Sequence, residues 1–272
     1  PNAGGNIEDY RAFVEKAHAA GCKVAVAADI LSLALLTPPG EWGADIVFGT
    51  TQRLGTPMFY GGPSAAYFAT RDEYKRNMPG RIIGWSKDKY GKLCYRMALQ
   101  TREQHIKREK ATSNICTAQA LLATMAGFYA VYHGPEGIRT IAGRIHSIAA
   151  FLEQEINKLG YRQMNAQYFD TLRFALPDNV SAQQVRTVAL SKEVNLRYFK
   201  NGDVGMSIDE TTDLAAVNVL LSIFGIAAGK DYTKAADIPE SCTIAEAFRR
   251  QSAYLTHEVF NKYHTETEMM RY

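Results

Sequence analysis

The sequence lacks the signatures of several classes of protein. Its four cysteines include no CxxC pair, so we expect reduced thiols and neither a disulfide framework nor a zinc site. Its six histidines form no HExxH or comparable metal-ligand pattern. The net charge of +3 is too small to indicate a nucleic-acid partner. The chain also contains no internal repeat and no low-complexity segment.

No initiator methionine and no signal peptide are present, and the sequence stops within a polar, helix-like run at residues 265–272. We interpret it as an excised piece of a longer polypeptide. The longest apolar stretch, residues 115–132, contains Thr117, Gln119 and Thr124 and has no asymmetry of flanking basic residues. A buried helix is therefore expected there in preference to a membrane span, and no membrane partner is predicted.

The first third of the chain alternates between helical and strand-like patterns. Residues 7–20 have apolar side chains at helical spacing, and residues 23–28 form an apolar run typical of a strand buried on both faces. Further strands are predicted at 44–48 and 65–69. Such alternation predicts an α/β domain with a largely parallel sheet. Ligands collect at the carboxyl ends of such strands, where Asp29 and residues 50–53 fall.

The rest of the chain predicts the remaining elements of this first domain and then a second, smaller α+β unit. We expect a charged helix and loop at 71–81, a hairpin turn at 87–92, a short strand at 94–99, and helices at 115–132 and 137–159. Strands at 171–176, 196–199 and 204–208 and helices at 181–190 and 211–224 follow, then a linker at 229–243 and a partly helical end that extends over a neighbour. The predicted organisation is a large-domain portion at 1–135, a long helix and small domain at 136–230, and a linker with a C-terminal extension at 231–272.

Two loops after the predicted strands have polar residues suited to a ligand. Asp29 either caps the following turn or holds a basic group of a ligand. The run Thr50-Thr51-Gln52-Arg53 either binds a phosphate through hydroxyl, amide and guanidinium groups or is a solvated loop. The glycines in residues 59–63 indicate a tight turn and only weakly a phosphate site.

Residues 102–114 combine basic side chains with a Thr112-Ser113-Asn114 cluster ahead of an apolar helix. Such a cluster caps a helix, and free N–H groups at the same place can bind an anionic phosphate, so both interpretations stay open. His18 and His146 lie on helical patterns and are expected to be structural. Surface or interface roles are expected for His257 and His264.

Several long strings are shared with one known family. They are the residues at 38–46, 69–81, 99–119, 254–257 and 263–269, which include LQTREQHI and REKATSNICTAQ. Over essentially its whole length the chain resembles the P-protein of the glycine cleavage system, glycine dehydrogenase (decarboxylating), an oxidoreductase of glycine catabolism. The resemblance implies the fold of pyridoxal phosphate (PLP)-dependent transferases of the aspartate aminotransferase superfamily. It further implies decarboxylation of glycine on PLP and transfer of the aminomethyl group to a lipoylated H-protein.

The resemblance assigns the chain to part of the N-terminal half, which lacks the lysine that forms the Schiff base. In that comparison Asp29 corresponds to the acid that holds the pyridine nitrogen, and Gln52 occupies the lysine position, where an amide cannot form an imine. Together they are expected to form a pseudo-site, with PLP held covalently by the partner half. The resemblance also implies that Thr112, Ser113 and Asn114 reach the PLP phosphate of that half, assisted by Arg102, Lys107 and Arg108, which alternatively steer the H-protein.

The expected role is therefore a piece of an enzyme that is inactive alone and completes the active site at its interface with the catalytic half. One alternative is a non-catalytic scaffold for subunit pairing and H-protein docking. Another is a self-sufficient PLP enzyme that uses a different lysine, such as Lys87 or Lys110, which Gln52 argues against. The expected compartment is the cytoplasm for a bacterial source and the mitochondrial matrix for a eukaryotic one.

Overall fold

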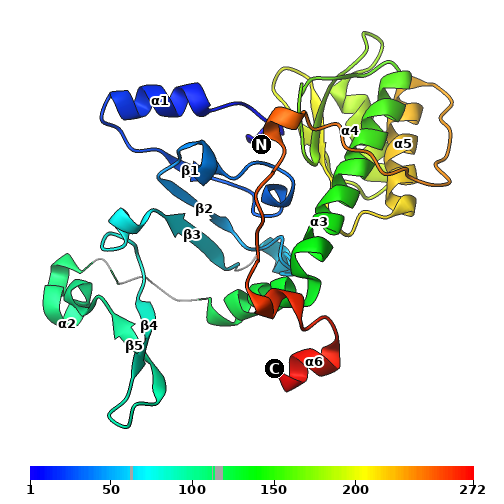
Figure 1. Cartoon of the computed structure of the whole chain (residues 1–272). Coiled ribbons are helices and arrows are strands. Elements are labelled where there is room, and N and C mark those ends of the chain that lie inside the picture. The colour runs from blue at the N-terminus through cyan, green and yellow to red at the C-terminus, as the bar shows by residue number, and fades with distance from the viewer. Residues whose placement is uncertain (62–63, 112, 114–118) are drawn as a thin grey trace.

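The computed structural model describes residues 1–61, 64–111, 113 and 119–272. Near the N-terminus, α1 (Arg11–Ala19) precedes a three-stranded sheet of β1 (Ala25–Ala27), β2 (Ile46–Thr50) and β3 (Ala66–Thr70), in that order (Figure 1). β1 and β2 pair in parallel, whereas β3 is antiparallel to β2. The prediction of α/β structure with parallel strands is confirmed. The prediction of a largely parallel sheet is corrected, because one of these two pairings is antiparallel.

The prediction that the first strand is buried on both faces is wrong. Ala25 and Ala27 are exposed, and on the same face of the sheet their neighbours Phe48 and Phe68 are exposed as well. Strands of this composition normally have both faces covered. Within the described chain, one face of this sheet has no such cover.

The second unit is a four-stranded antiparallel sheet with two helices. The strands lie in the order β6 (Arg162–Gln163), β7 (Thr171–Ala175), β9 (Val204–Ser207) and β8 (Arg197–Tyr198). The helices are α4 (Ala182–Ser191) and α5 (Leu214–Ala228). Ser181 and Gln184 form a capping box at the start of α4, which explains why this helix begins where its sequence pattern does.

The longest element, α3 (Ala120–Lys158), connects the two units. The separate helices predicted at 115–132 and 137–159 are joined in it through a kink at Gly134, where φ is 62° and Pro135 follows. Its first turns are amphipathic, with Leu121, Phe128 and Tyr132 exposed, which corrects the prediction of a buried helix. No described helix is both long and apolar enough to cross a membrane.

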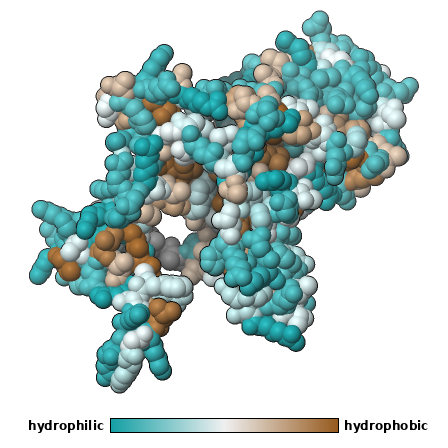
Figure 2. All heavy atoms as spheres, in the orientation of Figure 1, coloured by the Kyte–Doolittle hydropathy of each residue, from teal (hydrophilic) through white to brown (hydrophobic). Residues whose placement is uncertain are grey.

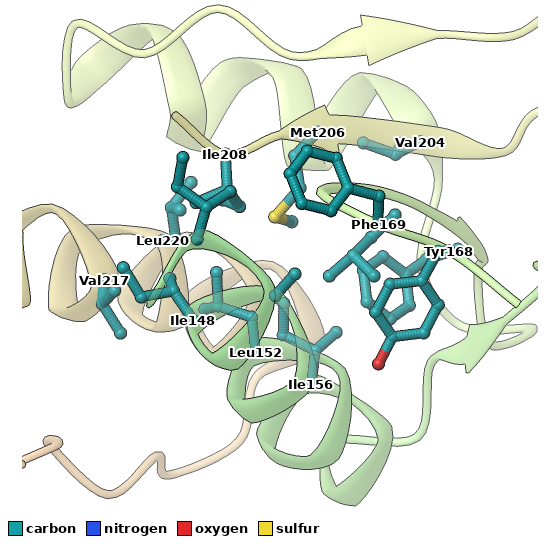
Figure 3. Packing of buried hydrophobic residues seen from close by; sticks show 14 of the residues in the cluster. Ile148, Leu152, Ile156, Tyr168, Phe169, Val204, Met206, Ile208, Val217 and Leu220 are labelled. Carbon is teal, nitrogen blue, oxygen red and sulfur yellow. The ribbon is translucent and has the colours of Figure 1, made fainter. Parts of the chain in front are cut away.

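The main hydrophobic core lies between the second half of α3, the small sheet and α5. Figure 3 shows Ile148, Leu152 and Ile156 of α3 facing side chains from the sheet and from α5. Ile156 and Leu152 have no exposed surface. The alternation of apolar residues on β7 places Leu172 and Phe174 inward, as a sheet with one solvated face requires.

A projection that we call the arm, residues 81–110, extends from the first unit. It contains the hairpin of β4 (Ile82–Lys87) and β5 (Leu93–Ala98), followed by α2 (Gln104–Lys107) (Figure 1). The hairpin turn lies at the predicted place. The charged helix predicted at 71–81 is wrong, since only the short 3-10 turn Asp72–Tyr74 forms there.

The C-terminal segment is mainly extended and ends in the short helix α6 (Glu266–Arg271). It returns across the first unit, where the backbone of Arg249 bridges to Leu36, and across the kink of α3, where the Tyr254 hydroxyl donates to the Pro135 carbonyl oxygen at 2.6 Å. Within this chain, the segment expected to lie over a neighbour packs on its own fold.

Candidate functional site

An ion cluster joins the two sheets at the carboxyl ends of β1 and β2. Asp29 follows β1, and Arg53 lies three residues beyond β2, so the parallel pairing brings them to the same edge. Nη1 of Arg53 lies 3.2 Å from Oδ2 of Asp29 and 2.7 Å from Oδ2 of Asp170, which immediately precedes β7. We call these three residues the Asp29–Arg53–Asp170 cluster.

The electrostatics of the cluster are those of a partly buried cation between two acids. Burial raises the pKa of the Asp29 carboxyl group, and the nearby guanidinium of Arg53 opposes that rise. Burial would lower the pKa of Arg53, but the charges of Asp29 and Asp170 raise it overall. The Leu31 backbone N–H also donates to Asp29 Oδ1 at 3.1 Å. The resulting arrangement places one guanidinium between two carboxyl groups.

Gln52 lies next to this cluster without joining it. Its backbone N–H donates to Thr50 Oγ1 at 3.1 Å, and its side chain is half-buried. The guanidinium beside Asp29 comes from the following residue, Arg53. A pyridine nitrogen would need this carboxylate to itself, but Asp29 already has an internal cationic partner.

The residues around Asp29 therefore do not fit PLP. Among the described lysines, Lys192 lines the same open depression of about 920 Å³, and it is exposed near the end of α4. Lys87 and Lys110 are exposed on the arm. None of these three lysines forms an ion pair with Asp29.

The phosphate interpretation of residues 50–53 is not supported by this geometry. The Arg53 guanidinium is engaged by two carboxylates, whose charge would repel a phosphate. The Thr50 hydroxyl lies 3.0 Å from Ser64 Oγ and accepts from the Gln52 N–H. Gly62 and Pro63 of the neighbouring turn lie outside the described residues.

The predicted phosphate-contacting segment is described only in part. Thr112 and Asn114 lie outside the described residues. Ser113 is buried, and its Oγ has no hydrogen-bond partner among the described atoms. The helix that this segment was expected to cap, α3, begins at Ala120, and its N-cap residue Gln119 makes no side-chain cap.

Arg102 has a structural role at the base of the arm. Its side chain is buried, and its guanidinium donates to the carbonyl oxygens of Lys75 (2.9 Å) and Gly80. These contacts keep the Arg102 guanidinium from contacting a phosphate or an H-protein. Lys107 and Arg108 are exposed, and for them the assisting or steering role stays a prediction.

The histidines make local contacts. His18 lies 2.8 Å from the buried Asp45, and His146 is fully buried between the Phe169 carbonyl oxygen and the Thr243 backbone N–H. His257 accepts from the Val259 N–H at the start of a 3-10 turn, and the ring of His264 lies 2.8 Å from the Tyr132 carbonyl oxygen. Within the described ranges, no group of three or more His, Cys, Asp or Glu residues is placed to hold a metal ion.

Two residues of the site were missed by sequence reasoning. Asp170 joins the cluster, although its only sequence signal is an acid between Phe169 and the following strand. The Tyr67 hydroxyl donates to the Ala28 carbonyl oxygen at 2.8 Å, beside Asp29, and burial raises the pKa of Tyr67 to about 12. Tyr67 lies on β3, and no sequence pattern indicates that its hydroxyl would reach the strand end beside Asp29.

The sequence is similar to those of glycine cleavage system P-proteins. The family model for the glycine cleavage system P-protein matches residues 1–224. Glycine dehydrogenase (decarboxylating) of Bacteroides fragilis is 84% identical over the whole chain, and that of Paraburkholderia xenovorans is 52% identical. The chain spans only 29% of the length of the first of these relatives and 28% of the second.

Solved structures with the same fold include one P-protein. A glycine decarboxylase of the glycine cleavage system, in inhibitor-bound form, is 33% identical with a TM-score of 0.73, over 82% of this chain and 53% of that chain. A sphingosine-1-phosphate lyase of Burkholderia pseudomallei is 14% identical with a TM-score of 0.57, over 84% of this chain and 50% of that chain. The latter likeness shows the fold alone. The fold of this chain is thus one that PLP-dependent enzymes use.

Proposed function

Because the chain belongs to the glycine cleavage system P-protein family, we propose that it is a portion of a glycine dehydrogenase (decarboxylating) that has a lysine-free pseudo-site. The whole protein would decarboxylate glycine on PLP and pass the aminomethyl group to a lipoylated H-protein. This portion, assigned to the N-terminal half, would be inactive alone. Its expected partners are the catalytic half, glycine and the H-protein, and with bacterial relatives the expected compartment is the cytoplasm.

The observation that supports this role best is the Asp29–Arg53–Asp170 cluster beside Gln52. In the related fold an acid at this strand end holds the cofactor's ring nitrogen and a lysine holds its aldehyde carbon. Here Arg53 pairs with the acid, and we assign Gln52, an amide, to the lysine position. Both substitutions favour a site that supports structure and leaves cofactor binding to the other half.

The test is the visible absorption of the folded chain with added PLP, followed by borohydride reduction and peptide mapping. We expect no stoichiometric aldimine band from the native chain. A Gln52→Lys variant is the matched control, and it too should lack a stoichiometric band because Arg53 still neutralises Asp29. A stoichiometric band mapped to one lysine of the native chain would show a PLP enzyme in its own right and overturn the proposal.

The scaffold role is the second candidate, and the exposed arm favours it. The two roles differ in whether residues of this chain touch the cofactor of the partner half. Loss of activity with normal assembly in a Thr112 variant of the whole protein would favour the first role. Weakened assembly or H-protein docking without any change in PLP affinity would favour the scaffold.

A further inference from the structure

One face of the arm's hairpin is apolar and exposed. The pairing of β4 with β5 places Trp85 opposite Tyr95 and Ile83 opposite Met97, with Leu93 next along the same face. Ile83 is 57% exposed, Leu93 70%, and Trp85 and Tyr95 75% each. The two aromatic rings meet edge to face at 6.3 Å. Figure 2 shows hydrophobic residues on the projection at its lower left, the position of the arm in Figure 1.

A hairpin with this composition is not expected to stay uncovered in water. An isolated two-stranded hairpin is marginally stable at best, and contiguous exposed apolar side chains usually mark an interaction site. The opposite face is half-buried for the most part, with Ile82 and Ala98 at the base of the hairpin and Gly84 and Ser86 further along β4. The described contacts of the arm lie at its base, where Arg102 and Glu103 are buried and Glu103 lies 3.6 Å from Arg81 Nε. The exposed apolar face of the hairpin is therefore a candidate interaction surface.

The charge of the arm narrows the choice of partner. Residues 81–110 include nine Lys or Arg and three Asp or Glu, whereas the whole chain has a net charge of only +3. Two copies of the arm placed face to face would bring these positive charges together. A surface with acidic side chains around an apolar centre would complement it.

We propose that the arm docks its apolar face on the part of the P-protein polypeptide that lies outside these 272 residues, at an apolar surface bordered by acidic side chains. The length of that polypeptide supports this occupant, because the chain spans only 29% of its Bacteroides relative. Trp85 and Tyr95 are the anchors, since buried aromatic side chains contribute most to such contacts. The inference rests on the proposed function, because it requires that this chain belong to a longer P-protein.

The test compares backbone hydrogen exchange of the hairpin in two settings. One is the 272-residue chain alone, and the other is a chimera in which these residues replace the matching segment of the full-length Bacteroides fragilis relative. Exchange over residues 82–98 should be at least about tenfold slower in the chimera, because docking suppresses local opening. Strand β7 should exchange at the same rate in both and serves as the internal reference.

Two variants of the chimera separate docking from a general change in folding. Trp85→Ser combined with Tyr95→Ser should restore fast exchange in the hairpin and leave β7 unchanged. Ser86→Ala combined with Cys94→Ser, on the opposite face of the same hairpin, should retain the slow exchange. Equal effects of the two double variants would contradict the assignment of the apolar face.

Glycine decarboxylation by the chimera, measured in parallel, tests the proposed function separately. An active chimera whose hairpin exchanges as fast as in the chain alone would overturn the docking proposal and leave the function standing. A slow-exchanging hairpin in a chimera without activity would support docking while counting against the function. If the chain alone sediments as a dimer with a protected hairpin, a second copy is the occupant and the proposal is wrong.

Discussion

Arg53 and Asp170 form a 2.7 Å ion pair between the loop after β2 and the first residue before β7, so that one guanidinium joins the three-stranded sheet to the four-stranded sheet. The same nitrogen of Arg53 also contacts Asp29, so both carboxylates pair with one guanidinium. Arg53 therefore links the two units through Asp170 and, through its second contact, gives the Asp29 carboxylate an internal cationic partner.

Replacing Arg53 with Met should destabilise the chain by about 2–4 kcal/mol at pH 8, since two partly buried carboxylates would lose their shared cation. Without the cation, burial raises the pKa of the Asp29 carboxyl group above its value in the unfolded chain. Such groups stabilise the fold below the unfolded pKa and lose that contribution as pH rises through the folded pKa. The difference in unfolding free energy between the native chain and Arg53→Met, measured by urea denaturation, should therefore be smaller at pH 5 than at pH 8.

The matched control for this variant is Lys75→Met, which removes an exposed ion pair with Asp72. Exposed pairs of this kind contribute little, so its effect should stay below about 1 kcal/mol at either pH. An Arg53→Met variant as stable as the control would show that the cluster does not hold the units together.

His146 should make the fold sensitive to mild acid. Its Nδ1–H donates to the Phe169 carbonyl oxygen at 2.8 Å, and its Nε2 accepts from the Thr243 N–H at 3.0 Å, so the neutral ring satisfies both bonds. Burial lowers the pKa of His146 below its usual value of 6.5. The neutral ring of His146 stabilises the fold fully above the unfolded pKa. This stabilisation falls as pH drops below that value, by at most about 1.4 kcal/mol per pH unit.

The measurement is the free energy of unfolding between pH 8 and pH 5 for the native chain and for His146→Gln. The variant should be less stable at pH 8, and its stability should change less over this range. The exposed His105 provides the control, since its replacement by Gln should leave the native pH profile unchanged. Parallel profiles for the native chain and His146→Gln would rule out this acid sensitivity.

Gly134→Ala should cost about 2–4 kcal/mol. The backbone there has φ of 62° and ψ of −176°, a conformation essentially restricted to glycine. An added Cβ would also lie 2.6 Å from the Phe260 carbonyl oxygen. On the same helix, Gly127→Ala meets no atom within 4 Å and should be neutral or stabilising by up to about 1 kcal/mol. The measurement is the thermal unfolding midpoint of each variant. Similar midpoints for the two would contradict the prediction that the kink requires glycine at position 134.

Thr112→Ala combined with Ser113→Ala in the full-length protein should raise the PLP dissociation constant at least about tenfold, if these hydroxyls donate to the phosphate of the partner half. A PLP titration followed by absorbance measures this. Thr124→Ala, which removes a hydroxyl that donates within α3, is the control and should not change the affinity. An unchanged constant in the double variant would exclude the cross-interface contact.

Local sequence signals predicted many of the elements and few of the contacts between them. The strands at 44–48 and 171–176 and the helix after Ser181 were found because apolar spacing and caps are encoded within a few residues. Asp29 and Gln52 were singled out by their place after predicted strands, and the family resemblance gave them their expected roles. Asp170 was missed because its partner lies 117 residues away along the chain. The exposure of β1 was missed because apolar composition does not reveal which covering segments are present.

The three-stranded sheet has a consequence for the isolated chain. Within the described residues, β1 and β3 each pair only with β2, so both outer edges of the sheet offer unpaired backbone groups, and the face that includes Phe48 and Phe68 is exposed. Open edges next to apolar side chains are templates for strand addition. A 272-residue product of this sequence is therefore expected to self-associate through these edges as its concentration rises.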